Sequence, residues 1–319
     1  MEYRKLGRFG VRVSEVGLGG WLTHGKSLDD SVTERIVQRA FELGINFFDT
    51  ADAYNGGEAE KSLAKATQGI RREDLVLATK CYFPMGDGPN NRGLSRKHIT
   101  ESVHNSIKRL NTDYLDLMQF HRYDSETSLD ETVRAIDDLV KQGKVLYWGV
   151  SEWKAHQITD LQRNVERVNA NPPSSNQPVY NMLNRYIEES VLPVSQQFGM
   201  GQVVFSPLAQ GVLSGKYLPG HPVPADSRAA DSNSNMFMGG VLDEKTLTRV
   251  QSLKTYVEGL GYTLPQFALA WCLRQPGVSS VIVGATRVDQ LEANVAASGL
   301  KLDAAIWSDA ESILDGKEG

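Results

Sequence analysis

One pattern recurs about eight times along the 319-residue chain and limits the folds that are open to it. A short apolar run rich in β-branched or aromatic residues is followed by a loop and then by an amphipathic stretch at helical spacing. The nearly continuous hydrophobicity of these runs is typical of parallel strands covered on both faces. We therefore predict an α/β protein in which one domain, residues 1–319, forms a (β/α)8 TIM barrel. The expected strands are residues 14–20, 45–50, 75–80, 114–121, 144–151, 174–180, 201–208 and 278–285.

The stretches between these strands carry the signals of helix ends. Residues 128–142 have apolar side chains at helical spacing, Ser128 and Glu131 are spaced as in a capping box, and Gly143 follows the last turn. The same kind of pattern predicts helices over residues 31–43, 95–110 and 265–273.

A doubly wound parallel sheet is the alternative arrangement. The glycines at 17–20 do not form a G-x-G-x-x-G pattern after the first strand, which favours the barrel. Before that strand, residues 3–13 contain two short alternating segments, predicting a β-hairpin that plugs the bottom of the barrel. Residues 209–242, a long loop after strand 7, are rich in Gly, Pro, Ser and Asn and have almost no periodicity. Since so long a loop is unusual inside a compact domain, we expect it to act as a lid over a cofactor.

Charge and cysteine content exclude several function classes. The formal net charge is −5 and like charges form no block, which argues against a nucleic-acid partner. The two cysteines, Cys81 and Cys272, lie far apart without metal-ligand spacing, so we expect neither a disulfide scaffold nor a metal site. We also expect no membrane span, because no apolar run approaches ~18 residues. With no secretory signal visible at the charged amino terminus, we expect a cytoplasmic protein.

Four polar residues stand at or just past the carboxyl ends of three successive strands. Asp49 closes the second strand, Tyr54 follows in its loop, Lys80 ends the third strand and His121 ends the fourth. Barrel enzymes collect their catalytic groups at this end of the strands. Such a set suits protonation of an oxygen: Tyr54 as the acid, Lys80 lowering its pKa from about 10, Asp49 orienting Lys80, and a neutral His121 donating to a carbonyl oxygen.

Each of these residues also has an ordinary structural explanation. Asp49 could cap a loop, Tyr54 could be a partly buried loop aromatic, and His121 could be a hydrogen-bonded core histidine. Lys80 is harder to explain in this way, because a charge at the end of an apolar strand needs a partner. Their common placement at strand ends favours a functional role.

A second group has the chemistry of a nucleotide site at strands five to eight. Phe205 can stack on a flat ring, and Gln177 can hydrogen-bond a carboxamide. The run 284–287 precedes a helix whose amino end favours phosphate, and Lys216 and Arg228 in the long loop could add positive charge. The alternatives are core packing for Phe205 and solvated loop charges for the two cations. Ser151 and the run 205–208 complete this group.

These motifs together resemble the aldo-keto reductases, within them the branch that includes the potassium-channel beta subunits. The resemblance covers nearly the whole chain. Its markers are Gly44-Ile45-Asn46-Phe47-Phe48-Asp49-Thr50-Ala51 with Tyr54, Leu77-Ala78-Thr79-Lys80, Tyr114-Leu115-Asp116-Leu117, Gly149-Val150-Ser151, Gln177-Pro178-Val179-Tyr180-Asn181, Ser206-Pro207-Leu208 and Val283-Gly284-Ala285.

The resemblance implies a (β/α)8 barrel that reduces a small-molecule carbonyl, an aldehyde or ketone, with NADP(H). It implies that Tyr54 is the general acid, that Asp49 and Lys80 tune it, and that His121 orients the substrate. It also implies a possible homo-oligomer, a tetramer in this branch. The cofactor contacts that carry over by matching position are Ser151, Gln177, Phe205, Ser206, Leu208, Gly211, Lys216, Arg228, Gly284, Thr286, Gln290 and Asn294.

Departures from the family pattern bear on the choice of function. The channel subunits carry asparagine at the position of His121, so the histidine favours a working enzyme over an NADPH-occupied sensing or partner-binding subunit with slow turnover. Glu152 stands where an asparagine or arginine is usual, and it is left out of the site. Trp21, Tyr82 and Trp153 are expected to line the substrate mouth. A Schiff-base lyase using Lys80 is a third possibility, but it leaves Tyr54 and the nucleotide residues unexplained.

Overall fold

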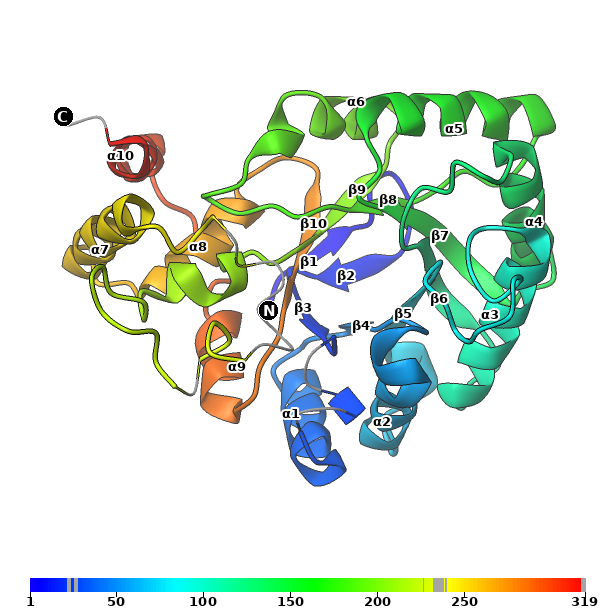
Figure 1. Cartoon of the computed structure of the whole chain (residues 1–319), viewed down its shortest axis with the longest axis horizontal. Helices are drawn as coiled ribbons and strands as arrows, with labels where there is room; N and C mark the ends of the chain where they lie inside the picture. The colour runs from blue at the N-terminus through cyan, green and yellow to red at the C-terminus, as the bar shows by residue number, and fades with distance from the viewer. Residues whose placement is uncertain (22–23, 26–27, 226, 232–237, 239, 317–319) are drawn as a thin grey trace.

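The computed structural model describes residues 1–21, 24–25, 28–225, 227–231, 238 and 240–316, and its centre is a closed barrel of eight parallel strands in the order β10-β3-β4-β5-β6-β7-β8-β9 (Figure 1). The eight expected strands are all present, each within its predicted range or a residue beyond it. The barrel strands are β3 (Val16–Gly19), β4 (Phe47–Asp49), β5 (Val76–Cys81), β6 (Leu115–Phe120), β7 (Val145–Ser151), β8 (Ser175–Gln177), β9 (Gly201–Phe205) and β10 (Val278–Val283). The predicted α/β fold, a (β/α)8 TIM barrel, is confirmed.

Helices surround the strands on the outside, and α7 and α10 lie farther out (Figure 1). These two outer helices are tied together by Tyr256, whose hydroxyl donates to Asp309 over 3.1 Å. The α-helices are α1 (Asp30–Glu42), α2 (Glu58–Ala66), α3 (Arg96–Arg109), α4 (Leu129–Lys141), α5 (Ala155–Val168), α6 (Val191–Gln197), α7 (Glu244–Gly259), α8 (Leu264–Leu273), α9 (Val288–Val295) and α10 (Ala304–Asp315). Short 3-10 turns are η2 (Tyr54–Gly57), η3 (Arg72–Asp74), η4 (Tyr186–Glu188) and η5 (Ala209–Ser214).

The predicted helix ends are nearly right, and one cap differs in detail. The Ser128 hydroxyl accepts from the Glu131 backbone N–H at 3.3 Å, as expected. The Glu131 carboxylate does not complete a capping box, because it accepts from the Arg96 backbone N–H of α3 at 2.9 Å instead. This bond ties the amino ends of α3 and α4 together.

Alternation along the strands creates two apolar layers. One layer lies between the barrel and its helices, and includes Phe48, Leu77 and Met118. The other fills the barrel itself, with Phe47 and Leu117 among its members. Because both faces are covered, strands such as β5, β6 and β10 are buried along their length, which explains their nearly continuous hydrophobic sequence. In β7, Leu146 is 44% exposed.

The amino-terminal hairpin closes the bottom of the barrel. Strands β1 (Tyr3–Lys5) and β2 (Arg12–Ser14) pair antiparallel, as predicted. Leu6 and Val13 of the hairpin belong to the inner apolar cluster, together with Val76, the first residue of β5. The opposite, carboxyl end of the strands remains for polar side chains, and we call it the mouth.

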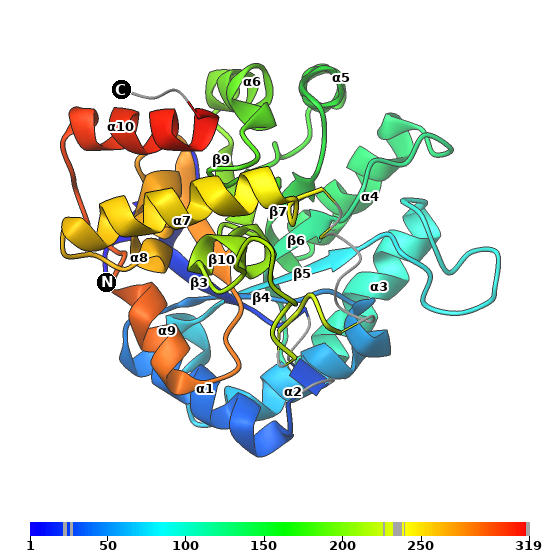
Figure 2. The ribbon, with the colours of Figure 1, turned by 60° about the vertical axis from the view of Figure 1, so that its left-hand side comes forward.

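The long loop after strand β9 reaches the mouth. Among its described residues there is no α-helix or β-strand; η5 supplies its ordered turns. The guanidinium of Arg228 lies 4.9 Å from the centre of the Trp21 ring at the end of β3. Figure 2 shows the described part of this loop in yellow-green, beside α7.

Candidate active site

The period of two along each strand that fills the barrel with apolar side chains also aims polar ones into the mouth. Val76 and Ala78 on β5 belong to the inner cluster, and the next inward position is Lys80. On β4, Phe47 is followed in the same way by Asp49. The apolar floor therefore lies directly below a layer of polar groups, in a place where water is excluded.

Asp49 and Lys80 form a buried ion pair at the centre of this polar layer. The Lys80 Nζ donates to Asp49 Oδ2 at 2.5 Å and to the Thr50 backbone oxygen at 2.8 Å. The Lys80 side chain is fully buried and that of Asp49 is 5% exposed. Burial lowers the pKa of Lys80, but the charge of Asp49 and the hydrogen bonds to Asp49 and Tyr54 outweigh burial and raise it. Lys80 is therefore a firmly held cation.

Tyr54 lies on the first turn of η2 with its hydroxyl over Lys80. The Lys80 Nζ donates to the Tyr54 hydroxyl at 3.3 Å and lies 4.9 Å from the centre of the Tyr54 ring. The chain turns sharply after Tyr54, through three residues with positive φ that end at Gly57 with φ +93°. Glycine tolerates this left-handed backbone, which lets α2 begin at the next residue.

The expected direction of the Tyr54 pKa shift is wrong. Burial raises the pKa of Tyr54, and although the Lys80 charge lowers it, Asp49 raises it again, so that the pKa lies above its ordinary value. Burial destabilises the phenolate by more than the nearby Lys80 ammonium stabilises it. Tyr54 therefore keeps its proton at neutral pH, as a proton donor must.

His121 packs against Tyr54 from the other side. The centres of the two rings are 5.7 Å apart with an interplanar angle of 72°, and Phe83 lies edge-on to His121 at 4.8 Å. Burial, followed by the charges of Lys80 and Arg122, lowers the pKa of His121 well below its usual range. Its Nδ1 is buried and has no hydrogen-bond partner among the described residues. The imidazole is thus neutral at pH 7, as expected.

Two amides complete the contacts of Asp49, and the sequence interpretation missed one of them. The second Asp49 oxygen, Oδ1, accepts from Gln177 Nε2 at 2.9 Å and from Gln119 Nε2 at 3.2 Å. Gln119 is fully buried on β6, two residues before His121. Side chains two residues apart on a strand share a face, so the inward position of His121 predicts that Gln119 also faces the interior of the barrel.

The three residues expected to line the substrate mouth are placed differently. The ring centre of Trp21 is 6.4 Å from that of Tyr54, beside the mouth. Tyr82 is half-buried and makes an edge contact with Phe83. Trp153 is only 1% exposed and belongs to the outer core layer, where its ring packs against Tyr123 at 4.8 Å. Trp153 therefore offers almost no surface to a substrate.

The residues that the resemblance assigns to the nicotinamide half lie at the ends of β7, β8 and β9. The Ser151 hydroxyl donates to the Gln177 backbone oxygen at 2.9 Å. The two Gln177 amide hydrogens face Asp49 and Gln119, so its oxygen is the group that can accept from a carboxamide. Phe205 is half-buried at the end of β9, and the Ser206 hydroxyl accepts from Gln210 at 2.6 Å. Leu208 ends this turn and is half-buried.

The remaining predicted cofactor residues fall into two places. In the long loop, Gly211 lies against Lys216, and the Lys216 Nζ lies 5.3 Å from the Tyr217 ring. Burial lowers the pKa of Arg228 to about 10, which leaves it charged at pH 7. After β10, space beside Gly284 is open, and the Thr286 N–H and hydroxyl both donate to Gln290 on α9 at 3.0 Å. Asn294 is buried on the same helix.

These groups fit the chemistry of NADPH. Lys216, Arg228 and the amino end of α9 supply cations and N–H donors of the kind that bind phosphates. Among the described residues, the buried Ser227 hydroxyl and the Gln210 amide oxygen have no hydrogen-bond partner. Each is a polar group in the long loop that a bound dinucleotide can satisfy.

Comparison with known proteins agrees with this geometry. A family model described as "Aldo/keto reductase family" matches residues 15–315. The chain belongs to the aldo/keto reductase family. The branch suspected from the sequence is matched as well: a protein of Oryza sativa subsp. japonica and one of Arabidopsis thaliana, each named "Probable voltage-gated potassium channel subunit beta", are both 43% identical over 300 residues. Each alignment covers 93% of this chain and 91% of the relative.

Two structural features are absent from the described residues of this aldo/keto reductase. Within the described part of the chain, no group of three or more His, Cys, Asp or Glu side chains is arranged to hold a metal ion. Across the same residues, none of the helices is both long enough and apolar enough to span a lipid bilayer.

Proposed function

We propose that this chain is an NADPH-dependent reductase of aldehydes or ketones, folded as one barrel domain over residues 1–319, with Tyr54 as the proton donor. The observation that supports this most directly is the packing of Tyr54 between Lys80 and His121, above the buried Asp49–Lys80 pair. This arrangement holds a protonated phenol, a fixed cation and a neutral imidazole at one water-poor site.

The proton moves from the Tyr54 hydroxyl to the carbonyl oxygen. Because the Tyr54 oxygen accepts from Lys80, its own O–H bond is directed away from Lys80 and toward the mouth. As that bond breaks, the charge developing on the phenol oxygen lies 3.3 Å from the Lys80 ammonium. Asp49 keeps Lys80 charged and in place during this step.

His121 orients the carbonyl group. A neutral imidazole carries one N–H, which can donate to the carbonyl oxygen while Tyr54 approaches the same atom. A protonated imidazole is disfavoured here because burial and the charges of Lys80 and Arg122 oppose it. Tyr54, and not His121, is therefore the acid.

The cofactor would be held by residues on the β7–β10 side of the mouth. When bound, the reduced nicotinamide supplies the hydride that adds to the carbonyl carbon. Gln177 and Ser151 would face the carboxamide, Phe205 would stack on the ring, and Lys216 and Arg228 would meet the phosphates. Ser206, Leu208, Gly211, Gly284, Thr286, Gln290 and Asn294 would complete the contacts.

The experiment that tests this proposal separates binding from turnover. Purified protein is titrated with NADPH and NADH by fluorescence, a reactive aromatic aldehyde is added, and the reduced nicotinamide absorbance is followed. Tyr54→Phe should keep NADPH affinity and lower turnover by roughly 10²–10⁴-fold, since the hydroxyl acts only in the transition state. Tyr256→Phe, on the outer helix α7, is the matched control. Wild-type turnover in Tyr54→Phe would show that the proton donor is wrong.

The names of the two plant relatives support a second candidate function. A subunit that holds NADPH, turns over slowly and associates with a channel would use the same cofactor residues. Binding of NADPH without consumption across a broad panel of aldehydes and ketones would favour this function. The presence of His121 favours the enzyme. Sedimentation of the purified protein tests the tetramer that the resemblance implies.

A further inference from the structure

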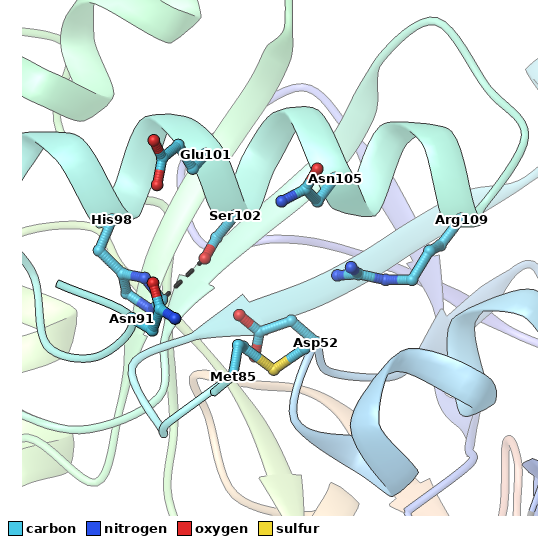
Figure 3. A pocket seen from close by; sticks show the side chains of 8 residues that line it. All are labelled: Asp52, Met85, Asn91, His98, Glu101, Ser102, Asn105 and Arg109. Atoms are coloured by element: carbon cyan, nitrogen blue, oxygen red, sulfur yellow. Dashed lines mark hydrogen bonds between the residues drawn. The ribbon is translucent and has the colours of Figure 1, made fainter. Parts of the chain in front are cut away.

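A second polar cavity, of about 170 Å³, lies away from the mouth, on the outer side of the loop that carries Tyr54. It is lined by Asp52 from the β4–η2 loop, by two residues of the β5–α3 loop and by one face of α3. Figure 3 shows Asp52 and Met85 on one side, facing α3, with Asn91 and His98 at one end. The lining residues are Asp52, Met85, Asn91, His98, Glu101, Ser102, Asn105 and Arg109.

Asp52 is the unusual member of this set. Its side chain is fully buried, and neither carboxylate oxygen has a hydrogen-bond partner among the described residues. Burial and then the charge of Glu60 raise the pKa of Asp52 to about 7. The Ala53 N–H and the Ser102 hydroxyl offset part of this rise without forming hydrogen bonds of ordinary geometry. Native proteins rarely leave a buried carboxylate without donors, so this one calls for a ligand.

The surroundings of Asp52 favour a cationic ligand. Arg109 could serve as its counter-ion, but the Arg109 Nε donates to the fully buried Glu60 at 2.5 Å, and its charge is already matched there. Burial lowers the pKa of His98, so this ring brings no charge at neutral pH. Glu101, exposed at the rim, is paired with Lys97 one turn earlier on α3, so the charge left without a counter-ion is that of Asp52. With Asp52 ionised, the cavity has a net negative charge that no described residue of its lining balances.

The volume of the cavity and the exposure of its lining residues define the ligand further. Exposure falls from Glu101 and Asn105 at the rim to Ser102 and Asp52 at the floor, where the Asp52 oxygens are covered. A cavity of about 150 Å³ holds benzene, so this one accommodates roughly six non-hydrogen atoms. Asn91 and Asn105 contribute side-chain amides to the wall. A small organic cation with N–H donors matches the volume, the charge and the lack of donors to Asp52.

We propose that this cavity is a binding site for a small primary ammonium ion, with the Asp52 carboxylate as its main partner and Glu101 at the entrance. The site does not depend on carbonyl reduction. It lies next to that chemistry, because the Asp52 backbone N–H donates to the Lys80 oxygen at 3.1 Å and Tyr54 follows two residues later.

Binding should depend on pH through Asp52. The titratable groups that face Asp52 are Glu60 of α2, Cys81 of β5, and His98, Glu101 and Arg109 of α3. Burial raises the pKa of the Cys81 thiol well above its usual range, so Cys81 stays neutral. Because ionised Asp52 is the form that holds a cation, affinity should be higher at pH 8 than at pH 5.5.

The test is calorimetric titration and thermal unfolding of the full chain with ethylammonium chloride at pH 8. Tetramethylammonium has the same charge without N–H donors, and sodium chloride matches the ionic strength. We expect saturable binding and a rise in Tm with ethylammonium alone. Asp52→Asn should weaken binding about tenfold or more, since it removes a charge-assisted hydrogen bond. Glu101→Gln at the exposed rim should weaken it only about two- to threefold.

Glu166→Gln, on the exposed face of α5, is the control and should bind like the wild type. Should Asp52→Asn fail to fold, Glu101→Gln and the pH dependence still decide the question. Equal binding of ethylammonium and tetramethylammonium, undiminished binding in Asp52→Asn, or no saturable binding to the wild type would each overturn the proposal.

Discussion

The Asp49–Lys80 pair gives the sharpest test of how the mouth is held together. We consider three variants: Asp49→Asn, Lys80→Met, and the two combined. Both side chains are buried, with their charged atoms 2.5 Å apart. Removing one partner of such a pair leaves a buried charge without its counter-ion, at a cost of about 3–5 kcal/mol. The double variant leaves neither charge behind, so its cost should fall at least about 2 kcal/mol short of the sum of the single costs.

These free energies translate into measurable melting temperatures. An unfolding entropy of about 2.1 cal/mol/K per residue gives about 0.67 kcal/mol/K for the 319 residues. A loss of about 4 kcal/mol therefore lowers Tm by roughly 6 °C in each single variant. Asp49 keeps its Gln119 and Gln177 donors when Lys80 is replaced, which places Lys80→Met near the lower end of the range.

The assay is scanning calorimetry of the four proteins at pH 7. Lys65→Met and Asp30→Asn serve as a matched control, because that pair is 2.6 Å apart but exposed, and should change Tm far less. Additive Tm shifts in the double variant would refute the reasoning, since they would mean that the two charges do not depend on each other. So would single shifts no larger than those of the exposed pair.

Two further predictions concern charge elsewhere in the molecule. The pKa of Asp52 is raised to about 7 from an unfolded value near 3.8, so the wild type loses stability as pH rises between these values, by up to about 4 kcal/mol at 1.36 kcal/mol per pH unit. Asp52→Asn should therefore raise Tm by several degrees at pH 8 and by much less at pH 4, and equal shifts at both would contradict this. Lys216→Ala and Arg228→Ala should weaken NADPH about tenfold more than NADH if they meet the 2′-phosphate, which fluorescence titration measures. Equal losses for both cofactors would remove that assignment.

The barrel was predictable because most of its strands are buried on both faces and therefore stand out as apolar runs, although β8 is buried and polar. The same apolar runs make the polar residues at the strand ends recognisable in the sequence, since Asp49, Lys80 and His121 each interrupt or follow such a run. The hairpin could be predicted from its alternation, which places Leu6 and Val13 toward the barrel. In all these cases, a local pattern decides the three-dimensional position.

Other features depend on packing between distant segments and could not be predicted. The period of two along β6 places Gln119 on the inner face, but its contact with Asp49, 70 positions away, depends on the fold. Trp153 follows a strand end, as a lining residue would, but packs into the core against Tyr123. The direction of the Tyr54 pKa shift depends on how deeply its hydroxyl is buried, which sequence spacing does not reveal.

Asp49 and Asp52 are three residues apart in the sequence, and their side chains have opposite directions and different partners. Asp49 points into the barrel, where an ammonium and two amides satisfy both of its oxygens. Asp52 points outward toward α3, where no described residue donates to it. The inner acid therefore fixes the loop that presents Tyr54, while the outer acid gives the same loop a charge that still needs a partner. A proton, or a bound cation, on Asp52 stabilises this loop from behind, so the stability of the Tyr54 loop should depend on whatever occupies the outer cavity.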